Sequence, residues 1–77
     1  MSLAVLPSLE ALEQRLAAFQ LALYGRSDAA AKVALTYTTF AEWDLDLARD
    51  GGKIVPVALA RAGKHLALAG TAVDVAH

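Results

Sequence analysis

Large apolar residues recur along the first third of the chain at the spacing of one face of an α-helix. They are separated by three, four, three and four positions and form a single stripe: Leu9, Leu12, Leu16, Phe19 and Leu23. Ser8 stands before the stripe as a favourable N-cap, and Gly25 follows it as a residue suited to the left-handed position after a helix. The pattern therefore predicts an amphipathic helix over residues 8–25.

This stripe has two possible partners. It can pack on the rest of its own domain, or it can form a seam with another copy of the helix, with Glu13 and Arg15 flanking the seam as in a coiled coil. The repeat covers barely more than two heptads, which is short for a coiled coil. Leu21 lies on the opposite face, so the last turns are apolar on two sides and a second contact surface is expected there.

The pattern changes after residue 31. Residues 32–38 alternate between larger apolar and smaller side chains and are rich in β-branched and aromatic types, which is typical of a strand. We therefore expect a strand over residues 32–38. The preceding alanines, 29–31, fit either a loop or one helical turn capped by Ser27.

Residues 40–50 fit both periods. Trp43, Leu45 and Leu47 alternate with Asp44 and Asp46, as in a strand with one exposed face. The segment also begins with a capping-box pattern at residues 39–42, and its bulky residues at 40, 43 and 47 share one helical face. A helix that ends at the glycines 51 and 52 is favoured, because no turn residue separates it from the preceding strand.

The last third of the chain predicts a β-hairpin, with strands at residues 53–60 and 65–69 and a turn at 61–64. Pro56 places the first strand at an edge of the sheet. A helix from Pro56 to just before Gly70 is the alternative, and Gly63 argues against it by about 1 kcal/mol. Residues 71–77 fit a last short strand or a frayed tail.

Together these elements predict a single small domain over residues 1–77 of the α+β class. A long N-terminal amphipathic helix precedes a strand, a helix and a β-hairpin, which form a small antiparallel-rich sheet; an all-α small helical bundle is the alternative. The order of these elements loosely resembles the dimerisation fold of Phd/YefM-type antitoxins. The matching elements are a strand, a helix capped by Thr39, a Gly-Gly-Lys-Ile-Val strand, an Arg-x-Gly-Lys turn and a last strand. The resemblance covers residues 32–70 and implies a small dimeric DNA-binding regulator.

Composition points to association with other protein chains. Hydrophobic residues make up 57% of the 77 residues and charged residues only 19%, against about 25% in average proteins. So short a chain cannot bury this much apolar surface alone, which predicts a homodimer or higher homo-oligomer and allows another protein partner. The net charge of −1 and the scattered cations make nucleic acid an unlikely partner. The apolar runs are too short to span a membrane, so we expect a soluble, cytoplasmic protein.

The sequence contains no cofactor, metal or catalytic motif. Asp44 and Asp46 would project from the same side of a strand about 7 Å apart, but would point apart on a helix. The histidines, His65 and His77, have no second metal ligand at a suitable spacing, and the chain has no cysteine. We therefore expect no catalytic, cofactor-binding or metal-binding residues.

The leading functional hypothesis is a non-enzymatic interaction or assembly module that acts as a homo-oligomer. Core packing is the leading interpretation of the aromatic residues, and the alternative for Trp43 is that it anchors an interface, because tryptophan is favoured at interface centres. The expected interface residues combine Trp43 with the helix stripe and its opposite face: Leu9, Leu12, Leu16, Phe19, Leu21, Leu23 and Trp43. The alternatives are the DNA-binding regulator and a small enzyme with an inter-subunit site that uses Asp44, Asp46 or His65.

Overall fold

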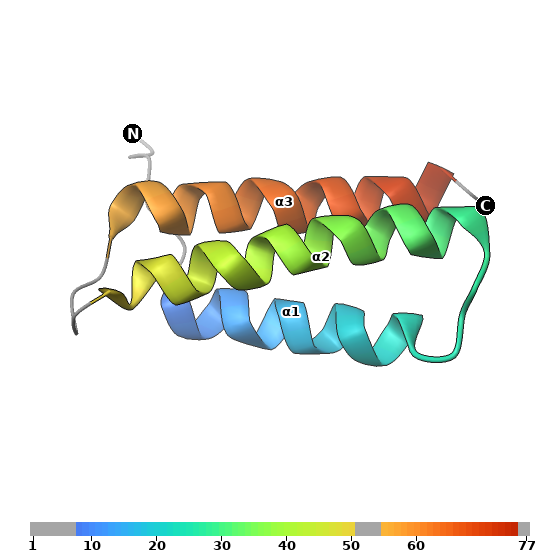
Figure 1. Ribbon diagram of the computed structural model, residues 1–77, viewed down its shortest axis with the longest axis horizontal. Helices are drawn as coiled ribbons and strands as arrows, with labels where there is room; N and C mark the ends of the chain where they lie inside the picture. Colours follow the sequence, from blue (N-terminus) through green and yellow to red (C-terminus); the bar gives the residue numbers. More distant parts are fainter. Residues whose placement is uncertain (1–7, 51–54, 76–77) are drawn as a thin grey trace, which may run out of the picture.

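The computed structural model describes residues 8–50 and 55–75, and these form three helices, each antiparallel to the one before it (Figure 1). Their bounds are Leu9–Leu23 (α1), Ala29–Ala48 (α2) and Pro56–Val75 (α3). The α+β prediction is wrong: the described residues contain no strand, and the fold is the alternative, an all-α small helical bundle. The glycines 51 and 52 and the first residues of the predicted hairpin, 53 and 54, lie outside the described residues.

Helix α1 forms as its sequence pattern predicts. Ser8 is the N-cap, and its side-chain oxygen accepts a hydrogen bond of 3.0 Å from the backbone N–H of Ala11. At the other end Gly25 adopts a φ of 78°, the left-handed conformation that ends a helix. The local signals at both ends of this helix were therefore sufficient to place it.

Helix α2 takes in the predicted strand at 32–38 and the predicted helix at 40–50 as far as Ala48. It begins at Ala29, capped by Asp28 rather than Ser27: the Asp28 carboxylate accepts from the Ala31 N–H at 3.2 Å. The β-branched residues that indicated a strand are accommodated, because the hydroxyls of three threonines donate to backbone carbonyls of the same helix: Thr36 to Lys32, and Thr38 and Thr39 to Leu35.

Helix α3 replaces the predicted hairpin. It starts at Pro56, where a proline is tolerated because the first N–H groups of a helix have no partner within it. It continues through Gly63 and past Gly70 to Val75, so the rival helix of the sequence analysis is correct but too short. A Cβ atom on Gly70 would lie 3.4 Å from Cζ of Phe19, which shows how closely α1 approaches α3 at this point.

The helices pack through a heptad-like repeat of buried positions. In α2 these positions are residues 31, 34, 38, 41, 45 and 48, and in α3 they are 59, 62, 66 and 69. The partly buried Val55, just before α3, and Val73 continue the repeat at either end. Many of them are alanines, so the backbones of α2 and α3 lie close together and share the most extensive contact in the bundle. Helix α1 adds Leu12, Leu16 and Leu23 to this core. Small side chains, rather than large apolar ones, thus define the main helix–helix seam.

Candidate functional site

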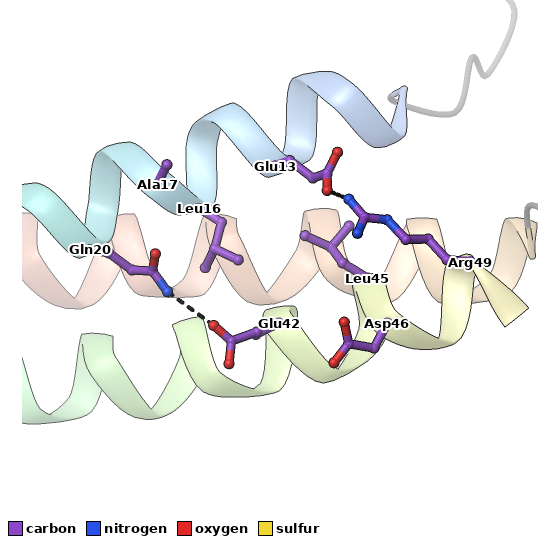
Figure 2. Close-up of a pocket in the computed structure, with 8 residues that line it drawn as sticks. All are labelled: Glu13, Leu16, Ala17, Gln20, Glu42, Leu45, Asp46 and Arg49. Atoms are coloured by element: carbon purple, nitrogen blue, oxygen red, sulfur yellow. Dashed lines mark hydrogen bonds and ion pairs between the residues drawn. The ribbon is translucent and has the colours of Figure 1, made fainter.

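Two grooves run along α2, one on each side. The groove between α1 and α2 has a volume of about 370 Å³, and Figure 2 shows the residues that line it. Polar contacts cross it from helix to helix: Nε2 of Gln20 donates to Oε2 of Glu42 at 3.1 Å, and Arg49 pairs with Glu13. These side chains are engaged with one another, so this groove is a polar link between two helices rather than an open site.

The second groove lies between α2 and α3, on the far side of α2 from the first. It also has a volume of about 370 Å³, and four of its six lining residues come from α2 and two from α3: Phe40, Trp43, Asp44, Leu47, Arg61 and His65. Apolar residues continue it in both directions. Val33 is seven residues before Phe40, Val57 is four before Arg61 and Leu68 is seven after it, which keeps them on the same side of their helices.

We call this surface the α2–α3 face and define it by its apolar residues, Val33, Phe40, Trp43, Leu47, Val57 and Leu68, together with Asp44, Arg61 and His65. All six apolar side chains are substantially exposed, from 37% for Leu68 to 65% for Val57. These fractions correspond to on the order of 500 Å² of apolar surface, near the upper end of the largest patches on monomeric proteins. Surfaces of this kind mark sites of interaction.

A charged cluster lies in the middle of the face. Asp44 is only 6% exposed, and its carboxylate accepts a hydrogen bond from Nδ1 of His65, with 2.6 Å between Nδ1 and Oδ2. Its other oxygen, Oδ1, lies 3.4 Å from Nε of Arg61. A buried carboxylate without partners would be strongly unfavourable, so the contacts with His65 and Arg61 on α3 explain how Asp44 is tolerated at this depth. The cluster ties α2 to α3 across the groove.

Aromatic rings surround this cluster. The ring of Phe40 lies 5.5 Å from that of His65 and 5.8 Å from that of Trp43, and Tyr37 stacks on His65 at 6.3 Å. These centroid distances are in the range in which aromatic rings attract one another. His65 is therefore held on one side by a carboxylate and on the others by rings, while Trp43, 58% exposed, is directed outward.

The predicted interface residues occupy two kinds of position. Leu12, Leu16 and Leu23 are buried in the bundle, and Leu9 and Phe19 pack against it, so the stripe of α1 is in contact with the protein's own chain. Leu21 is 79% exposed on the outer side of α1, and Trp43 is exposed on the α2–α3 face. Of the seven, these two have side chains free to meet another molecule.

The candidate acid–base residues separate in the same way. Asp44 and Asp46 are two positions apart on a helix, which turns them about 200° from each other. Asp44 accordingly faces α3, whereas Asp46 lines the groove toward α1, and His77 lies outside the described residues. The sequence analysis missed the pairing of Asp44 with His65. A signal was present: each directly precedes a core leucine, Leu45 or Leu66, the position from which charged side chains reach across helix pairs.

The described residues form no metal site or membrane span, and the chain has no match among known proteins that would point to another site. In residues 8–50 and 55–75 no three His, Asp or Glu side chains are placed to hold a metal ion, and no helix there is long and apolar enough to cross a membrane. Comparisons with family models, curated proteins and solved structures found no match to this chain. The antitoxin resemblance depended on strands that the described residues do not form, so it carries no further argument.

Proposed function

We propose that this chain is a non-enzymatic protein–protein interaction module that acts through the α2–α3 face. The observation that carries the proposal is the exposure of Phe40, Trp43 and Leu47 around a buried, fully partnered Asp44. Large apolar side chains exposed to water do not stabilise a folded chain, whereas covering them in an interface is favourable.

The arrangement of the face resembles the centre of a protein interface in composition. Aromatic residues and arginine are enriched at such centres, and the exposed Trp43 lies next to the half-exposed Arg61. Trp43 is the residue whose truncation should weaken binding most, because tryptophan combines large apolar area with few rotatable bonds.

Site-specific photo-crosslinking tests the proposal. A benzoylphenylalanine placed at position 43 or 57 should form covalent adducts in cells that produce the chain, and the same group at the exposed polar positions 10 and 14 of α1 should not. The Leu47→Asp substitution should abolish the adduct formed from position 43, because a carboxylate on the face opposes its burial. Equal adduct yields at face and control positions, or adducts that persist with Leu47→Asp, would refute an interaction through this face.

A second candidate function is a small enzyme with a site formed between subunits. It is favoured by one observation, the hydrogen bond from Nδ1 of His65 to Asp44, because a carboxylate on Nδ1 is how catalytic histidines are often oriented. In the part of the chain that the structure describes, the hydrogen bonds of the His65 ring include none to a hydroxyl nucleophile. Hydrolysis of an activated ester tests this candidate: a rate unchanged by His65→Gln would dismiss it.

The cellular location is also a proposal. We place the interaction in the cytoplasm, because a chain without cysteine forms no disulfides and so does not need an oxidising compartment. Fractionation of cells that carry the tagged chain tests it: recovery in the cytosolic fraction is expected, and recovery in an extracellular or envelope fraction would contradict it.

A further inference from the structure

We infer that the partner on the α2–α3 face is a second copy of this chain, related by a twofold axis that lies in the interface and crosses the helices. This inference rests on the proposed function and names its partner. In the resulting dimer α2 lies over the partner's α2 and α3 over the partner's α3, with their ends exchanged. The four helices then enclose both faces, and α1 of each copy stays on the outside.

The area of the face matches what a stable dimer requires. Its six apolar side chains contribute on the order of 500 Å², and the exposed parts of Arg61 and His65 raise the total to about 700 Å². A standard interface buries about 800 Å² from each partner. The α2–α3 face therefore provides nearly the whole of one side of such an interface without any rearrangement of the bundle.

The charges of the face permit a copy to pair with itself. The negative charge of Asp44 is balanced within the face by Arg61, so two faces brought together do not repel through an excess of one sign. His65 also contacts Asp44, and Lys64 is exposed on the outer side of α3, where its ammonium group stays in water. A face with several charges of one sign would instead have pointed to a partner of opposite charge.

The order of side chains along the face provides complementary shapes when the ends are exchanged. Val33 and Leu47 are each seven residues from Phe40, so an axis through Phe40 places the small side chain of one copy against the larger one of the other. Phe40 lies beside His65, which is near the middle of α3. The polar cluster then falls close to the axis, where a misaligned pairing would bury a charge against apolar side chains.

Sedimentation velocity and the fluorescence of Trp43, the single tryptophan of the chain, provide the first test. We expect a dimer that dissociates on dilution, with a Trp43 emission maximum that moves to shorter wavelength as the dimer forms. Leu47→Asp and Val57→Asp should each raise the dimer dissociation constant at least tenfold. Leu21→Asp, which places the same charge on a more exposed leucine of α1, should leave the dissociation constant unchanged. Circular dichroism confirms that each variant is folded.

Three results would overturn the inference. A monomer at all concentrations with Trp43 emission typical of water would show that no second copy covers the face. A monomer whose Trp43 emission is already at short wavelength would show that another part of the same chain does so. A dimer weakened by Leu21→Asp but not by Leu47→Asp would place the interface on α1 instead.

Disulfide trapping tests the orientation, and the absence of cysteine from the chain makes it unambiguous. In an oxidised equimolar mixture of Val33→Cys and Leu47→Cys chains, mixed disulfides should clearly exceed the sum of the two like-with-like disulfides, because the two positions meet across the axis. Random pairing would make the two amounts equal. A predominance of like-with-like disulfides, or trapping equal to that of a Gln14→Cys control pair on α1, would refute the exchanged ends.

These tests separate failure of the inference from failure of the proposed function. If purified chains remain monomeric while position 43 forms an adduct with another protein, and Leu47→Asp abolishes that adduct, the face is an interaction site but the partner is not a second copy. If neither a dimer nor a face-specific adduct forms, both are wrong.

Discussion

Replacement of a seam alanine by a larger residue should disrupt the bundle, and Ala62→Leu is the sharpest case. Ala62 has no exposed surface and belongs to the core cluster that includes Leu12, Leu45 and Leu66. Leucine has a similar helix propensity and is more apolar, so both local and transfer effects would favour the change. The three added carbons must nevertheless fit between α2 and α3, whose close approach depends on small side chains.

The expected cost follows from this geometry. Inserting methylene groups into a well-packed core destabilises proteins by about 1–3 kcal/mol. For a domain of this size each kcal/mol lowers the melting temperature by about 4–8 °C, so a decrease of roughly 5–20 °C is expected. A chain of this length has a total unfolding free energy of about 4–12 kcal/mol, so the loss is a large part of its stability.

Urea and thermal unfolding followed by circular dichroism at 222 nm provide the assay, with all chains at one concentration. Ala60→Leu is the matched control, because residue 60 is an exposed alanine of the same helix. It should change the melting temperature little, since neither propensity nor packing differs greatly there. An Ala62→Leu chain as stable as the parent, or a control equally destabilised, would refute the reasoning that alanine sets the seam.

Three further predictions concern local interactions. The Arg26 guanidinium, through hydrogen bonds to the Asp28 carboxylate, lowers the pKa of Asp28 from 3.8 to about 2. A lowered folded-state pKa stabilises the fold above pH 3.8, and this stabilisation is lost as the pH falls toward 2. The difference in melting temperature between the parent and Asp28→Asn should therefore shrink over that pH range. A constant difference would contradict this prediction. Gly70→Ala should raise the free energy of unfolding, measured in urea, by about 0.5–1 kcal/mol, because alanine favours the helix and the new Cβ meets Phe19 at an acceptable 3.4 Å. Destabilisation would show that the Phe19 side chain on α1 cannot move to accommodate the new Cβ. Asp44→Ala should lower the free energy of unfolding by about 1–3 kcal/mol, because it leaves His65 and Arg61 without their acceptor. The double variant Asp44→Leu with His65→Leu should lose less stability. Equal losses for the two variants would argue against a charge effect.

The sequence alone determined α1, because its evidence is local. Large leucines mark one face, Ser8 caps the first turn and Gly25 ends the last, so each signal acts within a few residues. It also showed that residues 40–50 favour a helix and that Asp44 and Asp46 would then point apart, both of which the structure confirms.

Tertiary packing decided the rest. The buried positions of α2 and α3 are largely alanines, which are too small to produce an apolar pattern, so the alternating Val33, Leu35 and Tyr37 dominated the sequence signal and indicated a strand. The helical alternative becomes favourable when alanine seams allow two helices to approach and bury their backbones together. Propensity is a weak preference, and this packing overrides it, including the penalty for Gly63 within α3.

The candidate site depends on the same packing. Asp44 and His65 are 21 residues apart, and an expected turn at residues 61–64 would have put them on different elements with no defined relation. Only the antiparallel alignment of α2 and α3 brings the carboxylate within 2.6 Å of the imidazole and leaves Trp43 exposed beside them. The sequence determined which residues are apolar and which are charged, but the register of two helices decided which of them meet, because that register is fixed by alanines distributed along both helices.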